Sequence, residues 1–191
     1  MSVYLISEQT LKDTTVLNEN VDPKLIAPAI LEAQDIEIQS ILGSTLYNKV
    51  LSLIPSGVIS TAPYANYKLL LDSFIQPSLK YYVLSELIFP MTFKLMNKSV
   101  ATRSSEFAQG IGSDEIGFNQ QFYKDKAEYY ATRMINYLRQ NQTLFPEYLA
   151  IVSPGLTTIY PRGTAYTNGM YLIDEARFCM IRDNHLYKYG N

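Results

Sequence analysis

The sequence contains few of the residues on which enzyme active sites most often depend. Its 191 residues include a single cysteine, Cys179, a single histidine, His185, and no tryptophan. One cysteine excludes a disulfide within the chain and favours the reducing cytosol. The sequence has no HExxH or CxxC motif, which argues against a zinc site. Because Cys179 and His185 lie six residues apart in a tail, we interpret Cys179 as a half-buried thiol and not as a catalytic nucleophile.

Charge is also scarce. Charged residues make up 18% of the chain, and 16 basic against 18 acidic residues give a net charge of −2. Without a basic excess, a protein that grips nucleic acid is disfavoured, whereas one that lets DNA slide past is not. The segment "SVYLISEQTLKD" after Met1 has neither a basic start nor a long apolar core, so we expect no signal peptide.

The residues that are present predict an all-α fold. Apolar residues make up 47% of the chain, which is enough for a real core. We expect a short bundle of about five helices, a long loop, and an extended C-terminal arm that contains a small β-hairpin. The helical domain then covers residues 1–151, including an N-terminal lead-in, and the arm covers residues 152–191.

Proline residues mark the start of the first long helix. Asp22 and Pro23 are typical of an N-cap and a first helical position. Pro28 lacks the N–H that an α-helix needs there, and its ring crowds the preceding turn. We therefore expect one turn over residues 23–26, a break or kink, and a main helix over residues 27–42.

The later helices follow from glycine, proline and apolar periodicity. Gly43 is expected to end the preceding helix in a left-handed conformation, and Ser44 to cap the next one. Residues 119–141 have a clear helical period, which places Glu128 on the polar face of that helix. Further helices are expected over residues 64–76 and 77–97, with a short one that starts at Pro146.

The segment 77–97 is apolar almost all round and so resembles a membrane span. A span needs about 20 apolar residues with few charges. Here Lys80, Glu86 and Lys94 interrupt the run, and Pro90 is expected to kink it. We therefore predict a central helix that is buried in a bundle or in a subunit contact.

The remaining patterns predict no catalytic, cofactor-binding or metal-binding residue. Residues 97–118 are polar and small, and we predict a long loop of the kind that is often functional. Within it, "GIGSDEIG" lacks the lysine of a P-loop and the glycine spacing of a dinucleotide-binding motif. Glu32 and Asp35 lie three residues apart on a polar helix face, so we interpret them as solvated carboxylates and not as an acid–base pair.

The composition changes after residue 152, where glycine, tyrosine and threonine become frequent. Asn168 and Gly169 between alternating apolar residues predict a β-hairpin. A segment of this kind cannot form its own core, so it must pack on the helices or on another molecule. The 16 tyrosines of the chain fit either half-buried surface positions or protein–protein contacts.

Two stretches carry a resemblance to a known family. The run "NVDPKLIAPAILEAQDIEIQSILGSTLYNKV" and the later "YLRQNQTLFPEYL" contain its most specific pieces, "PAIxxAQD", "LGxxLY" and "NxxxFPEY". They resemble small virion proteins of tailed bacteriophages, in particular the all-α head–tail connector, or adaptor, proteins of crAss-like phages. The resemblance covers roughly residues 4–150.

The resemblance implies a structural protein of the virion neck, made in the bacterial host cytoplasm, with no cofactor and no membrane. It implies a ring, of about twelve copies, that docks under the portal protein, contacts further neck or tail proteins and extends the DNA channel. Interface residues are predicted in the arm at Tyr160, Arg162, Tyr166, Tyr171, Arg177, Tyr187 and Tyr189. Residues that face the channel or the next ring are predicted in the long loop at Arg103, Phe107, Ile111, Asp114 and Glu115.

Two alternatives remain open at this point. Another neck or tail-completion protein would have a similar sequence pattern and would differ in its position in the particle. A helical enzyme would need a dispersed site that a deep pocket brings together from Glu86, Tyr130, Arg133 and His185.

Overall fold

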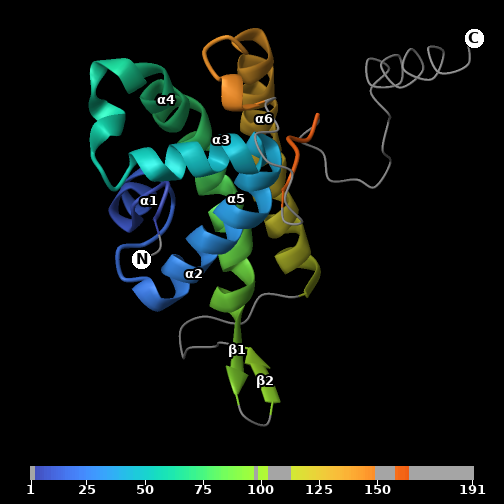
Figure 1. Cartoon of the computed structure of the whole chain (residues 1–191). Coiled ribbons are helices and arrows are strands. Elements are labelled where there is room, and N and C mark those ends of the chain that lie inside the picture. The colour runs from blue at the N-terminus through green and yellow to red at the C-terminus, as the bar shows by residue number, and fades with distance from the viewer. Residues whose placement is uncertain (1–2, 97–98, 103–112, 149–157, 164–191) are drawn as a thin grey trace, which may run out of the picture.

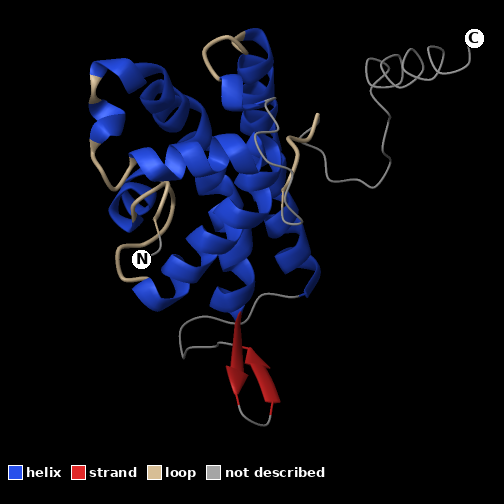
Figure 2. Ribbon diagram, viewed as in Figure 1, coloured by secondary structure: helices blue, strands red, loops and turns tan. Residues whose placement is uncertain are grey.

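The structure is a computed structural model that describes residues 3–96, 99–102, 113–148 and 158–163. Helices make up most of these residues and pack around a hydrophobic core (Figures 1 and 2). The predicted helical bundle is thus confirmed for the body of the protein. The predicted hairpin at Asn168 and Gly169 lies outside the described residues, as do Cys179 and His185.

The N-terminal lead-in packs on the bundle as a short arm. Leu5 is buried, its N–H donates to Gln34 Oε1 at 3.2 Å, and its carbonyl accepts from Gln76 Nε2 at 3.1 Å. Helix α1 (Glu8–Thr14) follows, and Ser7 caps it by accepting the N–H of its third residue at 3.0 Å. Two glutamine side chains therefore bind backbone groups of the lead-in that no helix or strand pairs.

The next helix continues through its internal proline. Helix α2 (Pro23–Ala33) begins where predicted, with Asp22 Oδ1 accepting the N–H of Lys24 at 3.0 Å. Of the break or kink predicted at Pro28, the break is wrong, and the helix runs on into a π-helix, η1 (Gln34–Ile38). Pro28 and Lys24 are both exposed, so the carbonyl that loses its donor lies on the solvent side, where water can bond it.

A bend in the following helix, α3 (Gln39–Leu53), lies at Gly43, which has φ 75° and ψ 156°. The predicted positive φ is confirmed, but this ψ belongs to a region that essentially only glycine adopts. Ser44 does not cap a new helix as predicted. Its hydroxyl accepts the N–H of Ile159 at 2.9 Å and the side-chain amide of Gln39 at 3.3 Å instead.

The third and fourth predicted helices form one continuous run. Helix α4 (Ala65–Leu70), the π-helix η4 (Leu71–Ile75) and helix α5 (Gln76–Thr92) follow one another, and the backbone is right-handed helical at both junctions. Pro77 therefore lies in the first turn of α5 without starting a separate helix. The loop before α4 contains two short 3-10 turns, η2 (Val58–Ser60) and η3 (Ala62–Tyr64).

Helix α5 lies in the middle of the bundle, between α2 and α6 (Ser113–Gln140) (Figure 1). Its buried residues are distributed around the helix: Ser78, Leu79, Tyr82, Val83, Leu84, Ser85 and Leu87. The predicted central helix is therefore confirmed, although it ends at Thr92, two residues after Pro90, and not at residue 97. None of the helices in the described part of the chain is long and apolar enough to cross a membrane.

The predicted long loop over residues 97–118 is wrong for the part of it that the structure describes. Strands β1 (Phe93–Met96) and β2 (Ser99–Thr102) form an antiparallel hairpin that projects from the end of α5 (Figure 1). Asp114 and Glu115 lie in the first turn of α6 and not in a loop, because acidic side chains favour a helix N-terminus. The other predicted loop residues, Arg103, Phe107 and Ile111, lie outside the described residues.

The predicted period of α6 is confirmed, with one correction. Ala127, Met134 and Leu138 are fully buried on the face that packs inward. Glu128, predicted on the polar face, is also buried. Burial raises the pKa of its carboxyl, and the charge of Lys124 opposes this effect. The chain then turns at a 3-10 helix, η5 (Pro146–Tyr148), which starts at the predicted proline.

The bend in α3 leads to a stability prediction. A Cβ at position 43 would lie 2.7 Å from two ring carbons of Pro161. The substituted residue would also have to adopt the positive φ of 75°, which is strained for any residue with a side chain. We expect Gly43→Ala to lower the free energy of unfolding by about 3 kcal/mol, measured by urea denaturation. Gly57→Ala is the control, because Gly57 also has a positive φ of 67° but open space around its Cβ position. It should lose only about 1 kcal/mol, and equal losses would contradict the proposed role of Pro161.

Candidate functional site

The described part of the C-terminal arm, residues 158–163, lies against α3 and replaces one of its hydrogen bonds. In a regular α-helix, the N–H of Ser44 would donate to the carbonyl of Ser40. Here the N–H of Ser44 donates to the carbonyl of Ile159 at 2.9 Å, and the carbonyl of Ser40 accepts the N–H of Arg162 at 3.0 Å. The arm therefore satisfies both backbone groups that the bend leaves open.

A close contact fixes the arm at the bend itself. The ring of Pro161 lies so near to Gly43 that no side chain fits between them. Proline also holds the residue before it in an extended conformation, which keeps the arm straight along this contact. The side chain of Tyr160, by contrast, is 48% exposed. One side of the arm is thus bound and the other is open.

An ion pair anchors the end of the arm. Arg162 Nη2 donates to Glu37 Oε2 at 2.9 Å, and the two side chains are only 19% and 11% exposed. Glu37 is presented by the π-helix η1. Tyr82 lies close by, and burial, together with the charge of Glu37, raises the pKa of its hydroxyl. Charge-assisted bonds of this kind contribute about 1.5–3 kcal/mol, so this pair is a main attachment of the arm.

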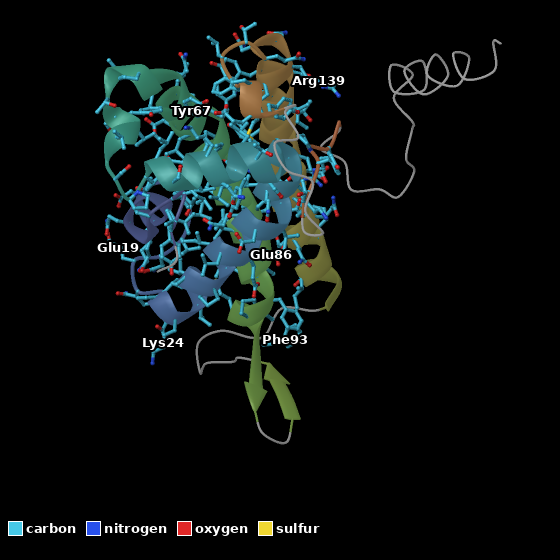
Figure 3. The ribbon with its side chains drawn as sticks, viewed as in Figure 1. Glu19, Lys24, Tyr67, Glu86, Phe93 and Arg139 are labelled. Carbon is cyan, nitrogen blue, oxygen red and sulfur yellow. The ribbon has the colours of Figure 1, made fainter. Side chains whose placement is uncertain are left out.

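Next to the ion pair lies a polar pocket of about 240 Å³. It is lined by Glu37, Ser85, Glu86, Gly117, Gln120, Gln121 and Lys124. Burial raises the pKa of Glu86, the charges of Glu32 and Glu37 raise it further, and Lys124 opposes them. Figure 3 shows Glu86 in the middle of the bundle, while Glu19 and Lys24 lie at its periphery. The pocket therefore holds two carboxylates of unequal environment and one cation.

Of the four residues of the dispersed enzyme site, Glu86 lines the pocket, Tyr130 and Arg133 do not, and His185 lies outside the described residues. Tyr130 stacks on Tyr81 with ring centroids 5.6 Å apart, and Arg133 lies over the ring of Tyr130. Both are on α6, six and nine residues beyond Lys124, the last pocket residue of that helix, which corresponds to about 9 and 13 Å. Among the described residues, no group of three His, Cys, Asp or Glu side chains could hold a metal ion.

The outer face of α6 exposes a row of aromatic side chains. Phe118, Phe122 and Tyr129 are 72%, 45% and 65% exposed, and their spacing of four and seven residues places them on one face. Lys126 Nζ lies 4.0 Å from the ring centroid of Phe122. We call these three aromatic residues the α6 aromatic face. The helical spacing of these three residues is visible in the sequence. The apolar row on the inward face of the same helix has a more regular pattern, and it alone was interpreted from the sequence.

A family model matches residues 38–153, more than half of the chain. The chain belongs to the DUF6712 family, a family of unknown function. No curated protein and no solved structure gives a significant match. The matched part of this DUF6712 chain includes α5 and α6, whereas Glu37 and the docked arm lie outside it.

The predicted interface residues of this DUF6712 protein fall in three groups. Tyr160 is half exposed and accessible to a partner. Arg162 has an intramolecular role in its ion pair with Glu37. The others, Tyr166, Tyr171, Arg177, Tyr187 and Tyr189, lie outside the described residues. Sequence reasoning did not identify Glu37 or the α6 aromatic face.

The pocket leads to a pH-dependent prediction. The raised pKa of Glu86 means that the folded state binds its proton more tightly than the unfolded state does. Above that raised pKa the buried charge destabilises the fold, and the penalty disappears as the pH falls to the ordinary glutamate pKa of about 4.3. Glu86→Gln should therefore increase the free energy of unfolding at pH 7 and have no such effect at pH 4, measured by urea denaturation.

The matched control for this prediction is Glu19→Gln, because Glu19 is exposed at the edge of the molecule (Figure 3). Its free energy of unfolding should stay close to that of the wild type at both pH values. A loss of stability in Glu86→Gln at pH 7 would show that attraction to Lys124 outweighs the cost of burial.

Proposed function

We propose that this chain is a structural subunit of a tailed-bacteriophage particle that forms a ring between portal and tail and extends the DNA channel. The proposal starts from the resemblance of "PAIxxAQD", "LGxxLY" and "NxxxFPEY" to head–tail connector proteins. The observation in the structure that supports it best is the α6 aromatic face, since assembly subunits need surfaces of this kind.

The composition of the α6 aromatic face fits a contact between proteins. Phenylalanine and tyrosine are enriched in interfaces, and exposed apolar patches mark interaction sites. Helix α6 has 28 residues, so it extends about 42 Å. Its inward face packs on α5 through Ala127 and Ser78, whose hydroxyl donates to the carbonyl of Ala127 at 3.1 Å. The opposite face is therefore free to meet another subunit along its length.

A ring requires two different patches on each subunit, because its contacts are heterologous. The α6 aromatic face supplies one, and we assign the second to the side that carries the docked arm. The hairpin of β1 and β2 projects beyond the helices (Figure 1), and we assign it to the channel or to the next ring component. A neck or tail-completion position is the alternative, and the place of the subunit in the particle distinguishes the two.

The α6 aromatic face can be tested by substitution. The variant Phe118→Ser/Phe122→Ser/Tyr129→Ser changes only exposed positions of α6, so the fold should be kept, but it removes the aromatic contacts. Each such contact contributes about 2 kcal/mol when it is central to an interface. We expect ring formation with the portal protein of the same phage to fall at least about tenfold, measured by electron microscopy of the mixture.

The control is Asn136→Ser, which changes an exposed residue on the same face of α6 without removing an aromatic ring. It should form the same coaxial ring as the wild type. A triple variant that assembles normally would exclude the α6 aromatic face as an interface. A wild-type chain that leaves the portal bare would exclude the adaptor position and favour one further along the neck.

A further inference from the structure

We infer that the site that holds the arm is a binding site for the arm of a second copy of this chain. We call this site the arm groove and define it by Glu37, Ser40, Gly43 and Ser44. In the assembled state, residues 158–163 of each subunit occupy the arm groove of its neighbour. The ring context rests on the proposed function, but the exchange of arms between two chains does not require the portal.

The arm groove needs an occupant of defined chemistry. The bend at Gly43 leaves the N–H of Ser44 and the carbonyl of Ser40 without their helical partners, and backbone groups that lack partners destabilise a fold. The carboxylate of Glu37, which is only 11% exposed, needs a cation. The fitting ligand is therefore an extended segment with a carbonyl, a proline and, three residues after the carbonyl, an arginine.

Residues 159–162, "IYPR", are such a segment. Each contact is made by the backbone or by a side chain of the segment itself, so the same contacts form when the segment comes from another copy. Nine residues, 149–157, separate the end of η5 from the described arm. Nine residues can extend about 30 Å, which is comparable to the width of a small domain and allows the arm to reach a neighbour.

The open side of the bound arm has apolar surface that a neighbouring chain would cover. Ile159 and Tyr160 expose apolar surface on the open side of the arm. The carbonyl of Gly163 accepts from Arg139 Nη2 at 3.0 Å, so the arm leaves the groove at the C-terminal part of α6. The arm groove therefore lies next to α6, the helix that carries the α6 aromatic face. A subunit that packs on this helix would also cover the open side of the arm.

The test exchanges the charges of the ion pair between two chains. In Glu37→Arg, the groove repels its own arm, and in Arg162→Glu, the arm is repelled by its own groove. When the two variants are mixed, each groove matches the arm of the other chain. We expect monomers from each variant alone and, from the mixture, a complex of twice the mass of one chain, detected by native mass spectrometry.

The double variant Glu37→Arg/Arg162→Glu is the matched control, because it restores opposite charges within one chain. It should behave like the wild type. We expect the mixed variants to associate at least about tenfold more tightly than either variant with itself. A mixture that stays monomeric while the double variant is folded would overturn the exchange of arms.

A second measurement keeps the native ion pair and so remains valid where the charge variants fold poorly. In a Cys179→Ser background, one tagged chain carries Ser44→Cys and a differently tagged chain carries Ile159→Cys. A short bismaleimide should join the two tags, while Ser52→Cys, exposed two turns further along α3, should give no product. Crosslinking that occurs only within a chain that carries both cysteines would also overturn the proposal.

The two proposals fail in different experiments. Charge exchange and crosslinking use this chain alone, so a negative result there counts against arm exchange and leaves the adaptor role in place. A portal that stays without a second ring counts against the adaptor role, whereas arm exchange between two chains would still stand.

Discussion

The structure depends on a helical hydrogen bond that is not formed, between the N–H of Ser44 and the carbonyl of Ser40. Gly43 turns the chain at this point, and the arm supplies the missing acceptor and donor. That contact brings Arg162 to Glu37. Both charges of this ion pair act on the hydroxyl of Tyr82 in the central helix α5. A residue with no side chain therefore helps to position this ion pair.

Local signals explain what the sequence could predict. Asp22 caps α2 where expected, because a cap depends on its own side chain and the next few residues. The buried surface of α5 and the period of α6 were equally clear from the sequence. The ion pair of Glu37 and Arg162 joins residues 125 positions apart, and no local pattern indicates it. Pro28 was misread because its effect depends on which side of the helix faces water.

The tyrosines show how one residue type takes several roles in this chain. Tyr67 donates to Glu147 Oε2 at 2.7 Å and joins α4 to η5, and Figure 3 shows it at the α4 end of the bundle. Tyr47 donates to Asp35, an exposed carboxylate on the predicted polar face. Tyr129 and Tyr160, in contrast, face outward. The described tyrosines therefore include both buried and exposed side chains, and only the three-dimensional arrangement separates them.

The two π-helices limit how the length of this chain can vary. A π-helical turn contains about one residue more than an α-helical turn, and one residue corresponds to a rotation of about 100°. Deleting one residue within Gln34–Ile38 would restore a regular helix, yet it would rotate α2 against α3 and carry Ile26 and Ile30 out of the core. The number of residues in η1 is thus as tightly constrained as the identity of any buried side chain.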